Sequence, residues 1–117
     1  MIEEIIAKRD GKRDLRFKGE RIANVSDEWQ NESQQNRWSE LSIYRTSSGK
    51  YVVHKRYRTC WVGESDGDAA VICSSPKEVY DCLVGKDGEL SSLSKKLLQK
   101  TAEEDAAFPD LTLEDLD

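Results

Sequence analysis

Residues 41–61 read LSIYRTSSGKYVVHKRYRTCW. Both halves of this segment are rich in β-branched and aromatic residues, which favour strands. Between the halves, a Ser-Ser-Gly sequence ending at Gly49 suits a three-residue loop closed by a glycine in the left-handed region. The segment therefore predicts an antiparallel β-hairpin. The cross-strand pairs expected from this loop are Ile43 with Val53 and Tyr44 with Val52.

A second hairpin is predicted nearer the N-terminus. Asp10-Gly11 is typical of a two-residue turn, and the residues after it alternate between apolar and charged. We expect strands over about 2–9 and 13–19, with residues 21–25 extending the second strand or starting a third. Residues 26–39 have no core-forming pattern and are predicted to be a surface loop.

The C-terminal half predicts one more strand and two helices. Residues 69–73 (AAVIC) are almost continuously apolar, which favours a short strand in the centre of a sheet. The sequence SPKE at 75–78 is a capping box with proline at the first helical position, and it predicts a helix that stops near Gly85. Leucines at helical spacing predict a second helix over about 89–106. The expected fold is a single α+β domain, residues 1–117, in which an antiparallel sheet of four to five strands (two hairpins plus a short central strand) packs against the two helices.

Composition narrows the class of protein. Of 117 residues, 37% are apolar and 35% are charged, so we expect part of the chain to be poorly ordered or covered by a partner. The net charge of −5 argues against a nucleic-acid coat protein.

No signal peptide is evident, and no segment approaches the roughly 18 apolar residues of a membrane span, so we expect a cytoplasmic protein with no membrane partner. Three cysteines without a CxxC pair favour reduced thiols.

The main hairpin segment is basic and aromatic. Residues 41–63 contain five cations and no acid, with tyrosines between them. One interpretation is a nucleic-acid surface, in which cations contact phosphates and aromatic rings stack on bases. The other is a solvated sheet face whose long side chains deter edge pairing. The candidate binding residues are Arg45, Lys50, Tyr51, Lys55, Arg56, Tyr57 and Arg58.

The C-terminus has the opposite character. Residues 101–117 contain seven acids and no lysine or arginine, and residues 109–117 form an acidic tail with interspersed leucines. The tail could solubilise the protein, cover the basic hairpin or bind a partner, and its leucines favour docking. The candidate tail residues are Leu113, Glu114, Leu116 and Asp117.

No catalytic or metal-binding pattern is found. His54 and Cys60 are six positions apart on one predicted strand, or about 20 Å if it is extended, so they cannot act together. Three cysteines and one histidine lack the spacing of a zinc site. We therefore expect no enzyme activity, no cofactor and no metal.

Four segments resemble the bacterial EXLDI family. They are LRFKGERIA at 15–23, IYRTSSGKYVVH at 43–54, VYDCL at 79–83 and the terminal EDLD at 114–117. The family is named for a C-terminal Glu-x-Leu-Asp-Ile motif, and this chain has Glu-x-Leu-Asp without the final isoleucine. The resemblance implies a bacterial cytosolic setting and names no reaction.

These features lead to two hypotheses. The first is a non-enzymatic protein-interaction or regulatory module that binds a protein partner through the acidic tail, the basic hairpin or both. The alternative is a nucleic-acid-binding regulator that acts through residues 45–58 of the hairpin.

Overall fold

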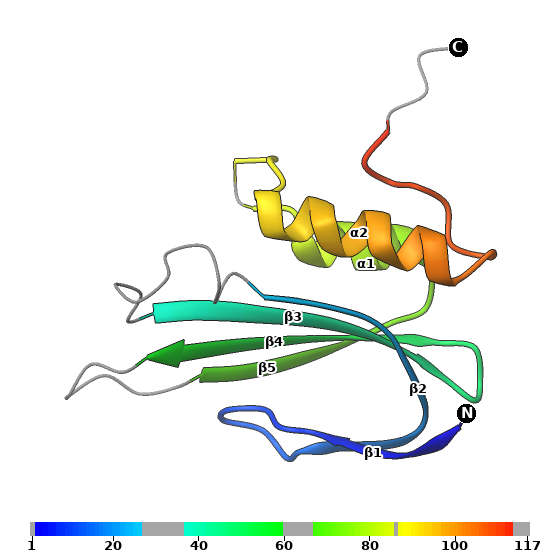
Figure 1. Ribbon diagram of the computed structural model, residues 1–117. Helices are drawn as coiled ribbons and strands as arrows, with labels where there is room; N and C mark the ends of the chain where they lie inside the picture. Colours follow the sequence, from blue (N-terminus) through cyan, green and yellow to red (C-terminus); the bar gives the residue numbers. More distant parts are fainter. Residues whose placement is uncertain (1, 27–36, 60–66, 86, 114–117) are drawn as a thin grey trace.

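The computed structural model describes residues 2–26, 37–59, 67–85 and 87–113 (Figure 1). Five strands are followed by two helices, which confirms the predicted α+β class. All neighbouring strands are antiparallel, in the spatial order β1-β2-β3-β4-β5. The elements are β1 (Glu3–Ala7), β2 (Leu15–Ser26), β3 (Arg37–Thr46), β4 (Tyr51–Thr59), β5 (Gly67–Cys73), α1 (Pro76–Leu83) and α2 (Ser92–Glu104).

The main hairpin joins β3 and β4 in the predicted register. Ile43 lies opposite Val53, and Tyr44 lies opposite Val52. Gly49 has a φ of 86°, which glycine adopts without strain. The hairpin is longer than predicted because residues 37–40 also belong to β3, so the last part of the predicted loop at 26–39 is strand. Residues 27–36 of that loop lie outside the described residues.

The N-terminal hairpin is also confirmed, and it bends away from the rest of the sheet. Gly11 has a φ of 73° in the turn between β1 and β2. Residues 21–25 extend β2, and the pairing with β3 shifts between Arg21 and Ala23. Such an irregularity bends a strand. As a result β1 and the first half of β2 curl under the face of the sheet that is opposite the helices (Figure 1).

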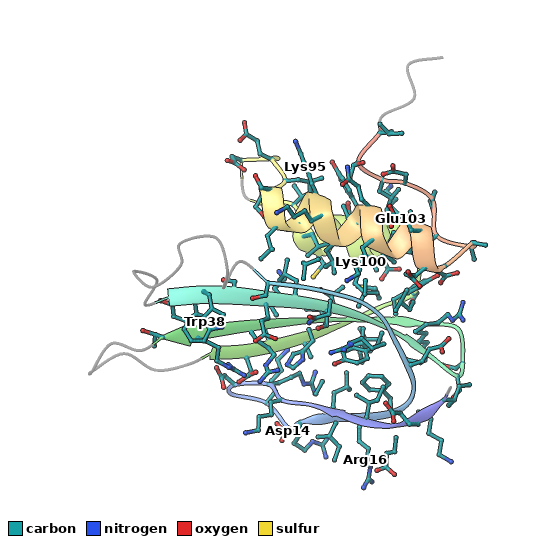
Figure 2. The ribbon with its side chains drawn as sticks, in the orientation of Figure 1. Asp14, Arg16, Trp38, Lys95, Lys100 and Glu103 are labelled. Atoms are coloured by element: carbon teal, nitrogen blue, oxygen red, sulfur yellow. The ribbon has the colours of Figure 1, made fainter. Side chains whose placement is uncertain are left out.

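Both helices cover one face of the sheet. Ser75 caps α1 as predicted, with its Oγ accepting a hydrogen bond of 3.3 Å from the amide of Glu78. α2 begins after a second capping serine, Ser91. α1 contacts β4 and β5, while α2 contacts β2 and β3. Charged side chains of α2, including Lys95 and Glu103, lie on its exposed side (Figure 2).

Apolar side chains form two cores, one on each face of the sheet. The main core lies between the sheet and the helices and includes Ile43, Val53, Leu97, Leu98 and Phe108. The small core lies under the curled hairpin. It contains Ala7, Val52 and Ala70, with Leu15, Phe17 and Tyr44 packed around them. A sheet buried on both faces explains why β4 begins with four buried residues in succession.

The predicted central position of residues 69–73 is wrong. They form most of β5, which is the last strand of the sheet and pairs only with β4 among the described strands. The apolar run has another cause, because the two faces of β5 serve different cores. Cys73 packs into the main core and Ala70 into the small one.

Candidate interaction surfaces

The seven candidate residues of the main hairpin do not form one surface. Side chains alternate between the two faces along β4. Tyr51 packs in the core under the helices, and Lys55 contacts α1 on the same face. Arg56 and Arg58 lie on the other face, beside Asp68 of β5. The hairpin therefore presents no continuous basic and aromatic stripe.

Most cations of the hairpin have partners within the chain. Arg45 is 2.9 Å from Glu20, and Arg56 is 3.8 Å from Glu40. The remaining contacts are those of Lys55 Nζ with the carbonyl of Cys82 at 2.9 Å and of Arg58 with Asp68 at 3.4 Å. The segment is free of acids in sequence, but the fold surrounds it with acids from elsewhere.

One acid of the C-terminal region does cover the basic hairpin. The buried Asp105 carboxylate lies 3.2 Å from the Arg45 guanidinium and accepts a hydrogen bond of 3.3 Å from the hydroxyl of Tyr51. The hydrogen bond to Glu20 and the charge of Asp105 raise the pKa of Arg45. Burial and then Asp105 raise the pKa of Tyr51. This network fixes the end of α2 to the sheet.

A second charged cluster lies on the opposite face, around Asp68. Its carboxylate is 3.5 Å from His54 Nε2 and 3.7 Å from Arg56 Nε, and both nitrogens are buried without a hydrogen bond. Burial lowers the pKa of His54, and the carboxylate of Asp68 opposes that shift. The cluster lies at the end of the small core and joins β4 to β5.

The described part of the acidic tail lies against the chain's own helices. Leu111 is half-buried and packs against the main core, whereas Leu113 is exposed. Together with Lys77 and Tyr80 of α1, these leucines line a hollow of about 380 Å³. The candidate residues Glu114, Leu116 and Asp117 lie outside the described residues.

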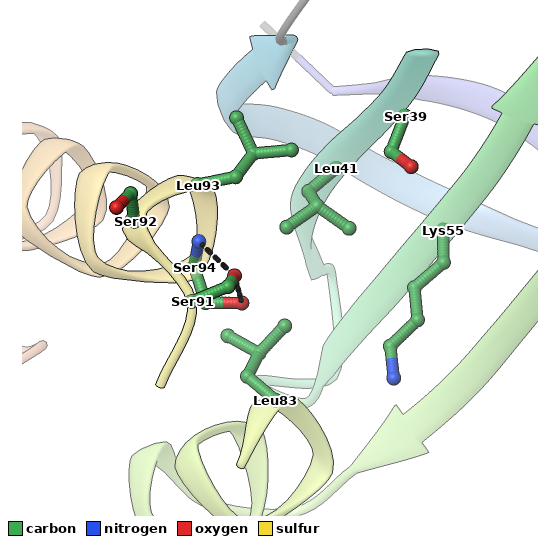
Figure 3. A pocket seen from close by; sticks show the side chains of 8 residues that line it. All are labelled: Ser39, Leu41, Lys55, Leu83, Ser91, Ser92, Leu93 and Ser94. Carbon is green, nitrogen blue, oxygen red and sulfur yellow. Dashed lines mark hydrogen bonds between the residues drawn. The ribbon is translucent and has the colours of Figure 1, made fainter. Parts of the chain in front are cut away.

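A larger hollow, of about 420 Å³, opens between the helix ends and the sheet (Figure 3). Several of its polar groups take part in local structure. Ser91 caps α2, and its Oγ accepts a hydrogen bond of 3.1 Å from the amide of Ser94. Lys55 binds a carbonyl near the end of α1, a position at which cations stabilise helices. We find no pairing of a nucleophile with a base among the residues that line it.

The cysteines offer little chemistry in the described part of the chain. Burial raises the pKa of Cys73 to about 11, which makes this thiol a poor nucleophile. Cys82 is half-buried, and Cys60 lies outside the described residues. The residues with defined positions contain no cluster of three or more histidine, cysteine or acidic side chains that could hold a metal ion.

Two exposed apolar side chains of the last strand were missed in the sequence. Val71 is 40% exposed and Ile72 is 50% exposed, on opposite faces of the edge strand β5. The sequence of β5, GDAAVIC, has no lysine or proline, the residues that usually protect an edge strand from pairing. The absence of these residues indicated an exposed edge in the sequence, but we did not use it because we predicted a central strand.

No family model matches the chain, and the searches of curated proteins and of solved structures return no significant match. The EXLDI resemblance stays a prediction. None of the helices in the described ranges is long and apolar enough to cross a membrane.

Proposed function

We propose that this chain is a protein-interaction module that binds an extended strand along the outer edge of β5. The observation that supports the proposal is the pair of exposed side chains on that edge, Val71 at 40% and Ile72 at 50%. Apolar residues on an unprotected edge favour pairing with another strand. In this mode of binding, main-chain hydrogen bonds supply affinity and alternate side chains supply specificity.

The contrast between the two edges of the sheet also supports the proposal. β1, at the other edge, carries Glu3 and Glu4, and the Glu4 carboxylate lies 4.0 Å from Arg16. Charged side chains of this kind deter strand addition. β5 has one charged residue, Asp68, and its carboxylate already has Arg56 and Arg58 of the same chain beside it.

The paired cations of the main hairpin support this proposal over the nucleic-acid alternative. A nucleic-acid surface needs cations that can exchange their counterions for phosphates along one face. Arg45, Arg56 and Arg58 instead contact carboxylates within the chain. The acidic tail remains a second candidate contact, and the proposal does not depend on it.

Affinity capture from a cell extract tests the proposed edge. The bait is the wild-type chain, and the test bait carries Ile72→Lys. Its matched control is Ile6→Lys, which places the same charge at an exposed isoleucine of the opposite edge strand. We expect proteins that bind the wild type and the control but not the test bait. An identical set of proteins on all three baits would contradict the proposal.

A further inference from the structure

We infer that the strand that pairs with β5 is the β5 strand of a second copy of this chain. The inference rests on the proposed function, and it names the partner. Two identical sheets would join at their edges into one continuous antiparallel sheet, with a two-fold axis perpendicular to it. That symmetry leaves the helices of both copies on the same side of the joined sheet.

The two-fold axis limits the register. In an antiparallel pair, residues directly opposite each other point to the same face of the sheet. Because side chains alternate along a strand, a residue can face only residues of its own face in the second copy. The axis must therefore lie midway between the two copies of one residue, so that this residue pairs with itself. Val71 is the residue that brings the exposed apolar positions into contact.

With Val71 on the axis, the paired side chains complement one another in size. The half-exposed Ile72 of each copy lies opposite the small Ala70 of the other, on the face of the small core. The two Val71 side chains meet on the face of the helices. The pairs are Val71 with Val71, Ala70 with Ile72, and Ala69 with Cys73, and the pairing stops before Asp68, whose backbone groups are already bonded to Asp10. Large residues against small ones allow close packing across the joined strands.

No like charges meet in this register. Asp68 is the only charged residue of β5, and it lies beyond the paired segment because its backbone groups are bonded to Asp10. Its carboxylate also has Arg58 at 3.4 Å and Arg56 at 3.7 Å within its own chain. Like charges directly opposite each other destabilise paired strands, and here there are none.

A strand of β5's own chemistry fits the edge better than a charged peptide does. Residues 69–73 contain no charge, so their outward side offers apolar contacts and backbone groups. A basic peptide would gain from the net charge of −5, but its cations would lie beside Val71 and Ile72. The second copy supplies an uncharged apolar strand with matching side-chain sizes.

Sedimentation velocity over a range of concentrations tests the inference on the full chain. We expect a reversible dimer for the wild type and for Ile6→Lys. We expect Ile72→Lys to weaken association by about tenfold or more, because each substitution occurs twice at a two-fold interface. A wild type that is monomeric at every concentration would overturn the inference. The proposed function would still stand if capture of another protein is lost in Ile72→Lys. A dimer that tolerates Ile72→Lys would show a different interface and would also overturn the inference.

A disulfide trap tests the register independently of affinity. Directly opposed residues of antiparallel strands have Cα atoms about 4.5–5.5 Å apart, within the range of a disulfide. Val71→Cys should therefore form a covalent dimer with oxidised glutathione, and dithiothreitol should reverse it. Ile6→Cys is the matched control, and the wild type accounts for the native thiols. Equal amounts of covalent dimer in all three proteins would contradict the register. Circular dichroism of each variant checks that it is folded.

Discussion

Asp10 and Asp68 join the two ends of the curled sheet. The amide of Asp10 donates a hydrogen bond of 2.9 Å to the carbonyl of Asp68. In return the amide of Asp68 donates one of 2.8 Å to the carboxylate of Asp10. The turn of the N-terminal hairpin is thus fixed to the start of β5, and the rest of the β5 edge remains open among the described residues.

Substitution of Asp10 should loosen this connection. Asp10→Ala removes the acceptor of one hydrogen bond, so we expect the free energy of unfolding to fall by about 1 kcal/mol. Urea denaturation measures the change. Lys12→Ala, in the same exposed turn, is the control and should leave the midpoint nearly unchanged. Equal midpoints for the two variants would show that the contact has no role in stability.

Substitution of Asp105 should cost more. Asp105→Asn removes a buried negative charge next to Arg45. We expect the free energy of unfolding to fall by about 2 kcal/mol, less than for a fully buried ion pair, because Arg45 is partly exposed to solvent. The neighbouring Glu104→Gln, at an exposed position, should change stability by about 0.5 kcal/mol or less. Urea denaturation again measures the difference. A loss for Asp105→Asn no larger than that for Glu104→Gln would contradict a structural role of this carboxylate.

The register of the main hairpin and the cap of α1 could be predicted from the sequence because both depend on residues close together in the chain. Gly49 fixes the loop, and Ser75 with Glu78 fixes the helix start. The contact between Asp10 and Asp68 spans 58 positions and has no local signal. The position of β5 was missed for a related reason. Periodicity reports which faces of a strand are buried, but it does not report which strands lie beside it.

Protonation of His54 should destabilise the fold. Burial holds its pKa below the ordinary value, despite the Asp68 carboxylate at 3.5 Å and a hydrogen bond to the backbone of Lys8. The nearby Arg56 also disfavours the charged imidazole. Because the unfolded chain binds this proton more readily, the stabilisation is complete above a pH of about 6.5 and declines as the pH falls below that value.

Urea denaturation at several pH values between about 7.5 and 5 measures this dependence around the ordinary pKa of histidine. His54→Gln should flatten the decline relative to the wild type, because glutamine does not titrate. If the stability of the wild type and of the variant declined in parallel as the pH falls, His54 would not contribute to the pH dependence.

Cys73 should resist alkylation in the folded protein. Its side chain is buried and its pKa is raised to about 11, so the thiolate is scarce at pH 8. Mass spectrometry after brief treatment with iodoacetamide should find the peptide that contains Cys73 unmodified, and denaturant should make it reactive. Rapid modification without denaturant would contradict the buried position of the end of β5.

Salt should strengthen association of the chain with itself. Each copy has a net charge of −5, so two copies repel at long range, and the proposed contact along β5 contains no ion pair between copies. Screening weakens that repulsion. Sedimentation at low and high sodium chloride measures the effect. An association that weakens as salt rises would indicate an ionic interface instead.

Amide hydrogen exchange of β5 at two protein concentrations tests the pairing of this edge most directly. If β5 pairs with β5 of a second copy, the amides of residues 69–73 exchange more slowly at high concentration in the wild type. They do not slow in Ile72→Lys, and the amides of β1 remain unchanged in both proteins. Exchange in β5 that is equally fast at both concentrations would contradict the account.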